Sequence, residues 1–252
     1  MTLTFSHALV TGGGTGIGKA VAEALAAAGV EVTICGRRME ALEAVAAVNP
    51  RIHPICADVA DEQSVAALYE AAQGARGAFD IVIANAGTGA SAPAHRTSLD
   101  LWQQTMAVNL TGAFLTVRPA IEPMRKAGRG RIVFIASIAG LKGAPYISAY
   151  VASKHGVVGL TRALAAELAQ TEITVNAVCP GYVETPMLER TIANIVEKTG
   201  RGEDAARAAI AGDNAHGRII APEEVADTVM WLCGEGARSV NGQAIALSGG
   251  EA

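Results

Sequence analysis

The sequence predicts an α/β fold, doubly wound, with one parallel seven-stranded sheet and helices on both of its faces. Three features lead to this prediction. Short apolar runs alternate along the 252 residues with stretches of helical length, which is the pattern of strand–helix–strand units joined by right-handed crossovers. The apolar runs are nearly continuous, which indicates strands buried on both faces. No linker, internal repeat or change in composition divides the chain, so a single domain is expected.

The seven expected strands are short runs rich in Val, Ile, Leu and Ala, separated by turn-forming or helical stretches. The third run contains Pro54, which cannot donate a ladder hydrogen bond and so weakens the strand. The sixth run is halted by Pro180 and Gly181. Strands are expected at residues 7–10, 32–35, 52–57, 81–84, 132–136, 175–179 and 244–247.

Six stretches of helical length lie between these strands. The first is rich in Ala and stops at Gly29, a residue that favours a helix C-terminus. The fourth is the longest, and Pro123 and Gly128 mark its end. Helices are expected at residues 21–28, 39–48, 64–75, 101–124, 150–169 and 223–232.

The stretch from about residue 186 to residue 221 departs from this pattern. It is polar, contains four glycines and lies between two core elements. A long insertion in a compact domain is usually functional or mobile. We therefore expect residues 186–221 to form a lid over a bound ligand.

Composition excludes several classes of protein. Half of the residues are hydrophobic and 17% are charged, which excludes a disordered chain. The net charge of −4 argues against a nucleic-acid partner. The four cysteines form no CxxC pair, so neither a metal site nor a disulfide framework is expected, and three of them lie in apolar stretches typical of a core. No targeting segment or run of 18 apolar residues is present, so we expect a cytoplasmic protein without a membrane partner.

A glycine-rich segment, TGGGTGIG at residues 11–18, follows the first strand and opens the first helix. Gly12, Gly16 and Gly18 stand where such a turn needs glycine for chain reversal, for approach to a pyrophosphate and for contact between helix and sheet. The helix N-terminus adds unpaired N–H groups and a partial positive charge. An ordinary glycine-rich turn is the alternative, but the position favours a dinucleotide site of the Rossmann type.

The end of the second strand is expected to select the nucleotide. A carboxylate there would bond the ribose 2′-OH of NAD, but the sequence has Arg37 and Arg38 instead. An arginine fork can hold the 2′-phosphate of NADP. NADP is therefore predicted in preference to NAD, and two solvated surface charges are the alternative.

Residues at the ends of the third and fourth strands complete the expected nucleotide site. Asp58 and Val59 follow the third strand, where the carboxylate could accept a bond from the adenine amino group or cap a turn. Asn85, Ala86 and Gly87 end the fourth strand. Gly87 would let the chain pass close to the adenosine ribose, whereas a structural tie between neighbouring strands is favoured for Asn85.

Four further residues suggest proton-transfer chemistry. Tyr150 and Lys154 lie four apart in a helical stretch, so their side chains share one helix face. A cation beside a phenol lowers its pKa, and a large lowering would need both Lys154 and the oxidised nicotinamide; Tyr150 could then act as general acid or base. Ser137 follows the fifth strand and could stabilise charge on a substrate oxygen. Asn109 interrupts an apolar helical segment and could hold a water that relays protons, or be a core polar residue.

Together these segments, with NAG at 85–87, YVASK at 150–154 and PGYVET at 180–185, resemble the short-chain dehydrogenase/reductase family over essentially the whole chain. The resemblance implies that Asn109, Ser137, Tyr150 and Lys154 form a catalytic tetrad for hydride transfer between nicotinamide C4 and a carbonyl or alcohol carbon. It also implies that Lys154 bonds the nicotinamide ribose. Ala84 departs from the family pattern, in which many members have Asn.

The resemblance also extends the cofactor site. The segment after the sixth strand matches the one that flanks the nicotinamide carboxamide, and Thr15 stands where some NADP-using members carry a basic residue. Cofactor choice therefore depends on the two arginines. The expected cofactor-binding residues are Gly12, Thr15, Gly16, Ile17, Gly18, Arg37, Arg38, Asp58, Val59, Asn85, Ala86, Gly87, Tyr150, Lys154, Pro180, Gly181, Val183 and Thr185.

Within the family, the segments YVASKHGVVGLTRALAAELA, ITVNAVCPGYVETPM and GRIIAPEEVA look most like 3-oxoacyl-thioester reductases and aromatic-polyketide ketoreductases. This implies NADP(H)-dependent reduction of a small-molecule ketone, such as a 3-oxoacyl thioester, or oxidation of the corresponding secondary alcohol. An NAD-dependent dehydrogenase of a secondary alcohol or hydroxyacyl thioester is the alternative, and a non-catalytic nucleotide sensor is a remote one. The resemblance also implies a homotetramer that packs through the helices at 101–124 and 150–169.

The substrate wall is expected from residues 139–147, from Tyr182 and from Met187 onward. His95, His155 and His216 could make polar contacts, but surface positions are expected for all three.

Overall fold

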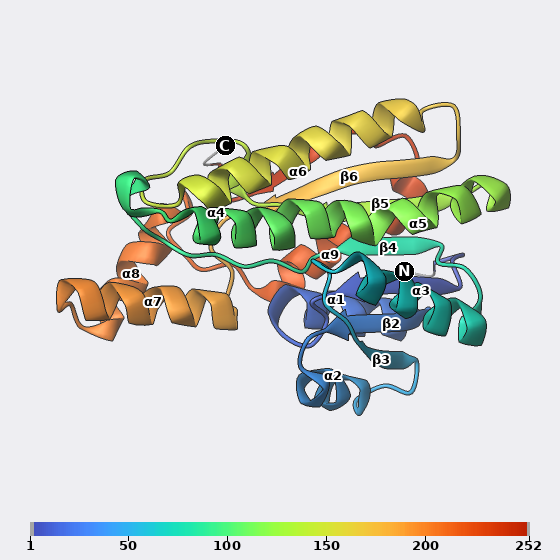
Figure 1. The fold of residues 1–252 in the computed structure, drawn as a ribbon, viewed down its shortest axis with the longest axis horizontal. Helices are drawn as coiled ribbons and strands as arrows, with labels where there is room; N and C mark the ends of the chain where they lie inside the picture. Colours follow the sequence, from blue (N-terminus) through green and yellow to red (C-terminus); the bar gives the residue numbers. More distant parts are fainter. Residues whose placement is uncertain (1–2, 251–252) are drawn as a thin grey trace.

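The computed structural model describes residues 3–250 and contains the parallel seven-stranded sheet that the sequence predicts (Figure 1). The strand order is β3-β2-β1-β4-β5-β6-β7, and each neighbouring pair is parallel. The strands are β1 (His7–Thr11), β2 (Glu31–Gly36), β3 (Ile52–Cys56), β4 (Ile81–Ala84), β5 (Gly130–Ile135), β6 (Ile173–Pro180) and β7 (Ala244–Leu247).

Helices cover both faces of the sheet, and each face has its own apolar core. The strand side chains of one face pack with α3, α5 and α6, and those of the other face pack with α1, α2 and α9. The sheet is therefore the middle of three layers. The helices that form these two outer layers are α1 (Gly16–Ala27), α2 (Met39–Ala46), α3 (Glu62–Arg76), α5 (Gly112–Ala127), α6 (Ser148–Glu167) and α9 (Pro222–Cys233).

The position of β3 explains why Pro54 is tolerated. β3 lies at the edge of the sheet, where one side of its backbone has no partner strand among residues 3–250. A proline on an edge strand does not break a ladder between two neighbours. The strand predicted at residues 52–57 is therefore present, with bounds of Ile52–Cys56.

The long helix predicted at residues 101–124 is present, but it is not α-helical throughout. It consists of α4 (Leu99–Met106), a π-helical turn (Ala107–Thr111) and α5, which ends at Ala127. Pro119 and Pro123 lie inside α5, whose end is set by Gly128 with φ 69°. A proline inside a helix costs about 3 kcal/mol, but one face of α5 is buried against the sheet, so packing outweighs that local cost.

The stretch at residues 186–221 contains two helices that the sequence analysis did not predict, α7 (Pro186–Thr199) and α8 (Glu203–Asp213). They lie together at one end of the molecule (Figure 1). Leu188 and Ile192 of α7 pack with Ala206 and Ile210 of α8 in a small apolar cluster separate from the two main cores. Pairs four residues apart share a helix face, so these few apolar positions suffice to join two otherwise polar helices.

The sheet topology has its switch point between β1 and β4, the place at which doubly wound sheets have a ligand-binding crevice. The chain leaves β1 toward β2 and β3 on one side, and β4 begins the half of the sheet that runs to β7. In doubly wound sheets, ligands bind outside the carboxyl ends of the strands at this switch point. The glycine-rich turn after β1 and the segment after β4 border this place.

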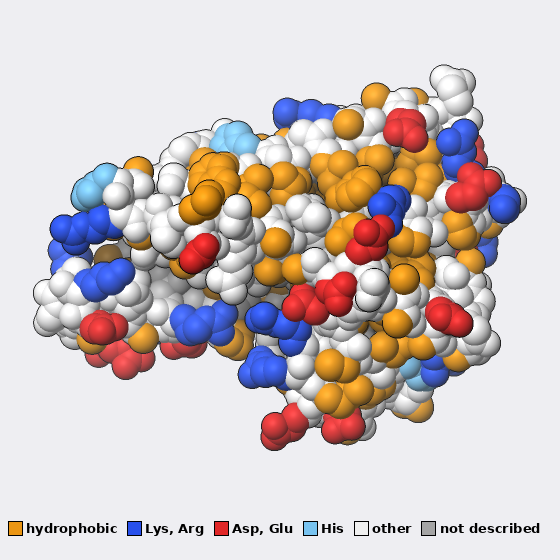
Figure 2. All heavy atoms as spheres, in the orientation of Figure 1, with side chains coloured by type: hydrophobic (Ala, Val, Ile, Leu, Met, Phe, Trp, Pro, Cys, Tyr) orange, Lys and Arg blue, Asp and Glu red, His pale blue; other side chains and the backbone are white. Residues whose placement is uncertain are grey.

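Three of the four cysteines are buried, as predicted, and Cys56 is exposed; all four are free thiols. No helix within residues 3–250 is long and apolar enough to cross a membrane. Over the same range, no group of three or more His, Cys, Asp or Glu side chains is arranged to hold a metal ion. On the face shown in Figure 2, Lys and Arg side chains are interspersed with Asp and Glu.

Candidate active site

The glycine-rich turn is too tight for side chains at the positions that the sequence analysis identified. Gly12 and Gly16 have φ of +66° and +53°, a region that L-residues rarely adopt. A Cβ on Gly18 would lie 2.4 Å from the Gly12 carbonyl oxygen. Thr15 is the N-cap of α1, but its side chain makes no capping hydrogen bond. The first N–H groups of α1 therefore receive no hydrogen bond from the N-cap side chain, and such groups at a helix N-terminus can bind an anionic pyrophosphate.

The segment after β6 faces this turn. A Cβ on Gly16 would lie 2.9 Å from Cγ2 of Thr185. Thr185 is the N-cap of α7, where its hydroxyl accepts a hydrogen bond from the Leu188 N–H at 3.3 Å, and Pro186 occupies the first helical turn. The residues expected on either side of the cofactor therefore meet across the crevice.

Asn85 and Thr11 tie the segment after β4 to the end of β1. The Asn85 side chain donates to the Thr11 carbonyl oxygen at 2.8 Å. The Thr11 hydroxyl in turn accepts from the backbone N–H groups of Asn85 and Ala86, both at 3.0 Å. Asn85 thus has the strand-tying contact that was favoured for it. Thr11 was missed as a functional residue, although its place immediately before the glycines was a usable signal.

The arginines expected at the nucleotide ribose are exposed at the end of β2. Among residues 3–250, neither Arg37 nor Arg38 forms an ion pair, so both guanidinium groups are available to an anionic ligand. Asp58 accepts a hydrogen bond from the Ala60 N–H at 3.0 Å, so it caps a turn, which was one of its two expected roles. Val59 is buried and packs against Gly112. The two exposed arginines supply hydrogen-bond donors that fit a phosphorylated dinucleotide.

The side chains expected to carry the chemistry come together beside the crevice. Ser137 follows β5, and its side chain is close enough to the Tyr150 phenol of α6 to lower the pKa of that phenol. The Ser137 hydroxyl also donates to the Pro180 carbonyl oxygen at 3.4 Å. Lys154 is buried one helical turn after Tyr150, and its Nζ lies 5.6 Å from the Tyr150 ring centroid. Phenol, hydroxyl and ammonium thus occupy one small region.

Burial dominates the electrostatics of this group in the protein alone. The pKa of Tyr150 is raised, chiefly by burial, and the hydrogen bond with Ser137 offsets this in part. In the protein alone the pKa of Tyr150 is therefore not lowered, although the sequence suggested that Lys154 and the oxidised nicotinamide together could lower it. The Lys154 ammonium donates to the Ile135 carbonyl oxygen at 2.8 Å, and burial lowers its pKa to about 8. At neutral pH the site holds a neutral phenol and a protonated lysine.

Asn109 lies in the π-helical turn between α4 and α5, where its side chain is buried. Its Oδ1 accepts from the Thr88 N–H at 2.8 Å, and its Nδ2 donates to the Thr88 carbonyl oxygen at 2.9 Å and to Ser153 Oγ at 3.1 Å. Ser153 Oγ donates to the Tyr150 carbonyl oxygen at 2.8 Å. These are the contacts of a core polar residue, which was one of the two roles expected for Asn109, and they hold the segment after β4 against α6.

Ser153 and Thr88 were missed by the sequence analysis. Thr88 contacts Asn109 through its backbone N–H and carbonyl groups, which carry no residue-type signal, whereas Ser153 contacts Asn109 through its hydroxyl. The π-helical turn was also missed, although Asn109 in an apolar stretch marked the place. Such turns are common at functional sites, and this one brings Asn109 against Ser153.

The expected substrate side lies between the segment after β4 and the start of α7. A Cβ on Gly89 would lie 3.7 Å from the Tyr150 ring and 3.8 Å from Met187 Sδ. Tyr146, in the expected substrate wall, has φ 67° and an exposed side chain, and its carbonyl oxygen accepts from the Ala92 N–H at 2.7 Å. A bulky residue with positive φ is uncommon and marks this loop as constrained.

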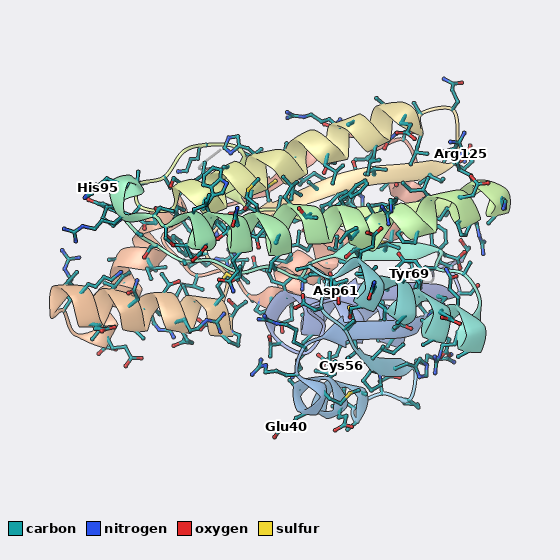
Figure 3. All side chains as sticks on the ribbon, in the orientation of Figure 1. Glu40, Cys56, Asp61, Tyr69, His95 and Arg125 are labelled. Carbon is teal, nitrogen blue, oxygen red and sulfur yellow. The ribbon has the colours of Figure 1, made fainter. Side chains whose placement is uncertain are left out.

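The three histidines considered as polar contacts are exposed. His95 lies at the outer end of the loop before α4 (Figure 3), and His155 and His216 are also on the surface. The His155 ring bonds to the Val151 carbonyl oxygen at 3.0 Å, within its own helix. The surface positions expected for these residues are those observed.

This geometry defines a class of protein. A glycine-rich crevice at the switch point of a parallel sheet, with Tyr, Lys and Ser beside it, is the site of a dinucleotide-dependent oxidoreductase acting between CH–OH and C=O groups. The family described as "short chain dehydrogenase" matches residues 6–195. The chain belongs to this family.

Similar proteins include dehydrogenases and reductases. A D-beta-hydroxybutyrate dehydrogenase of Rhizobium meliloti (strain 1021) is 34% identical over 255 residues, which cover 96% of this chain and 97% of the relative. A variant of actinorhodin polyketide ketoreductase, solved with NADPH, has a TM-score of 0.95 at 36% identity and covers 100% of this chain and 99% of that chain. Levodione reductase has a TM-score of 0.92 at 33% identity, with coverage of 98% and 97%.

Proposed function

We propose that the protein is an NADP(H)-dependent reductase of a small-molecule ketone, such as a 3-oxoacyl thioester, which also oxidises the corresponding secondary alcohol. The observation that carries this proposal is the proximity of the Ser137 hydroxyl and the Lys154 ammonium to the side chain of Tyr150. The ketoreductase and hydroxybutyrate dehydrogenase among the similar proteins are named for ketone and hydroxyl chemistry, which supports this class of substrate.

Each residue of the group has a role that its environment supports. Bound NADPH supplies the hydride. Because burial raises the pKa of Tyr150, its phenol stays protonated at neutral pH and can donate a proton to the substrate oxygen. The Ser137 hydroxyl can donate to the same oxygen as negative charge develops. Lys154 supplies a positive charge beside the phenol, and Asn109 positions α6 through Ser153.

The preference for NADP(H) is supported by the uncommitted guanidinium groups of Arg37 and Arg38. An arginine fork binds a phosphate with charge-assisted, bidentate hydrogen bonds. NAD is the alternative, and the relative named for hydroxybutyrate oxidation keeps an NAD-dependent dehydrogenase as the second candidate.

Three further parts of the proposal concern the surroundings of the site. We propose that α7 and α8 form the lid; the Asn194 side chain of α7 donates to Ser91 Oγ at 3.0 Å, which joins α7 to the segment after β4.

A homotetramer is supported by the exposed apolar side chains of Leu99, Trp102 and Phe114 along α4 and α5. A cytoplasmic location is supported by the free thiols.

The experiment is a screen of 3-oxoacyl thioesters, cyclic ketones and secondary alcohols with both cofactors, read by absorbance of the reduced nicotinamide. We expect kcat/KM to favour NADPH, and Arg37→Ala and Arg38→Ala to raise the KM for NADPH by about tenfold or more while changing the NADH reaction little. Arg125→Ala is the matched control, because Arg125 is an exposed arginine near the opposite end of the molecule (Figure 3). A preference of the parent for NADH would favour the second candidate, and no turnover in the whole panel would contradict the proposal.

A further inference from the structure

Asn214, at the end of α8, clamps the backbone of Tyr182. Its side chain is fully buried. Its Oδ1 accepts from the Tyr182 N–H at 2.9 Å, and its Nδ2 donates to the carbonyl oxygens of Tyr182 at 3.1 Å and Arg218 at 2.7 Å. One amide therefore contacts both backbone polar groups of Tyr182, in the way that a neighbouring strand would.

The clamped residue lies within the active-site segment. Tyr182 follows Gly181, and Pro180 directly before it receives the hydrogen bond from Ser137. The Tyr182 phenol is close enough to Tyr150 that a charge on it would raise the pKa of Tyr150. A shift of the Tyr182 backbone would thus move residues that lie next to the catalytic group and to the expected cofactor site.

The fit between Asn214 and this segment is close. A Cβ on Gly181 would lie 2.2 Å from Asn214 Oδ1, a distance at which something must move. Gly181 does not have a positive φ, so glycine is needed here for space and not for backbone conformation. The amide thus occupies the space that a side chain at position 181 would fill.

A second contact joins α8 to the same segment. Arg207 pairs with Glu184 at 2.7 Å and also with Glu189, in the first turn of α7. This pair is exposed, so it contributes little to stability. The buried Asn214 is therefore the stronger link between α8 and residues 180–185.

We propose that Asn214 is a positioning residue for the reaction: it couples the α7–α8 segment to residues 180–185 and holds the backbone of Tyr182, next to the segment that Ser137 contacts. This inference rests on the proposed function. Asn214 touches the backbone of Tyr182 and acts on the reaction through it. A displacement of about 1 Å at a reacting group can cost about a hundredfold in rate, so a small shift of residues 180–185 is sufficient for a measurable effect.

The chain offers a matched control at Asn176. This side chain is also buried, and it also clamps backbone groups: Nδ2 donates to the Val240 carbonyl oxygen at 2.7 Å and Oδ1 accepts from the Gln243 N–H at 3.0 Å. Its partners lie on the stretch that leads into β7 and not on residues 180–185. A purely structural role for Asn214 predicts that equivalent changes at the two asparagines have equivalent effects.

The test compares Asn214→Ala and Asn214→Asp with Asn176→Ala and Asn176→Asp. The measurements are thermal unfolding, the Kd for NADPH by fluorescence titration, and separate kcat and KM values for a ketone well below the unfolding temperature. We expect all four variants to be less stable. Only the Asn214 variants should also change kcat, or the KM or Kd of a ligand, by about tenfold or more. Changes below about twofold in both pairs, or equal changes in both, would overturn the proposal.

A double-mutant cycle tests the contact itself. Gly181→Ala should displace the Asn214 amide and reproduce the ligand-binding and kcat changes of Asn214→Ala. In the double variant the new methyl group has space, so its effect should be no larger than that of either single change. Fully additive effects would contradict the coupling. Should neither Asn214 variant fold, Gly181→Ala takes their place in the comparison with Asn176.

The two proposals fail in different ways. If the parent reduces no ketone, the proposed function fails, but the NADPH titrations and hydrogen exchange at residues 180–185 still report on the coupling. If the parent is active and the Asn214 variants behave as the Asn176 variants do, the coupling alone is wrong.

Discussion

The Nζ of Lys154 lies 5.6 Å from the ring centroid of Tyr150, and it is held there by a 2.8 Å hydrogen bond to the carbonyl oxygen of Ile135. The lysine thus stands on the same face of α6 as the phenol but does not bond to its hydroxyl. Burial opposes both charged forms, since it raises the pKa of the phenol and lowers that of the ammonium to about 8.

Lys154 should therefore set an alkaline limit on activity. The ammonium loses its charge as the pH rises through about 8, so kcat/KM for ketone reduction should fall above that pH. Lys154→Met should remove this fall in kcat/KM at alkaline pH and should lower kcat/KM at pH 7. Because burying a charge is costly, the same variant should melt at the parental temperature or higher. A pH–rate profile checks the change in kcat/KM, and a melting curve checks the stability. If kcat/KM of Lys154→Met still falls above pH 8, another group is responsible for the fall.

Ser153 should matter for turnover without touching the substrate. Ser153→Ala breaks the path from Asn109 to the Tyr150 carbonyl oxygen. We expect kcat to fall by about tenfold with little change in NADPH affinity. Thr161→Val is the control, because Thr161 is a buried hydroxyl on the same helix that donates to the Val157 carbonyl oxygen at 2.8 Å. Equal kcat losses in both variants would remove the special role of Ser153.

The glycine turn should not accept a methyl group at position 18. Gly18→Ala places a Cβ 2.4 Å from the Gly12 carbonyl oxygen, so the turn must shift at a cost of about 1–3 kcal/mol. NADPH binding should be lost or strongly weakened. Gly74→Ala in α3 is the opposite case, with nothing within 4 Å of the added Cβ; it should stabilise the protein by about 0.5–1 kcal/mol and leave binding intact. Titration calorimetry and melting curves check both variants.

His7 makes stability depend on pH at the other end of the sheet. Its ring is buried and bonds to the Gly77 carbonyl oxygen at 3.0 Å and to the Thr33 hydroxyl at 2.9 Å, and burial lowers its pKa. The unfolded chain then binds a proton first, at a pH near 6.5. The contribution of the neutral His7 ring to the free energy of unfolding is fully present above that pH. It is lost as the pH falls, by up to about 1.4 kcal/mol per pH unit for this one group.

Urea unfolding between pH 7.5 and pH 5 measures this dependence. The His7→Gln variant should show a shallower slope than the parent over that range. His155→Gln, at an exposed position, is the control and should keep the parental slope. An identical slope in the parent and in His7→Gln would contradict the assignment.

Sequence patterns were sufficient for the sheet and for much of the site because they reflect local geometry. The spacing of Tyr150 and Lys154 fixes a shared helix face, and the glycines after β1 fix a tight turn. Continuous apolar runs predicted the positions of the strands. Pro54 is compatible with its strand because β3 lies at the edge of the sheet.

What the sequence could not supply depends on contacts between backbone and distant side chains. Asn109 meets Thr88, and Asn214 meets Tyr182, through N–H and carbonyl groups that every residue type has. The helices α7 and α8 were missed because only a few apolar positions join them and the rest of the stretch is polar. The π-helical turn depends on packing and leaves no clear periodicity.

The most direct test of the account is the rate of hydride transfer in Tyr150→Phe, compared with Tyr69→Phe. Tyr69 is also buried, and its hydroxyl donates to the Thr116 carbonyl oxygen far from the crevice. Tyr150→Phe should fold and bind NADPH like the parent but reduce the ketone about 10²–10⁴-fold more slowly. Tyr69→Phe should keep its rate and lose about 1 kcal/mol of stability. Parental turnover by Tyr150→Phe would contradict the account.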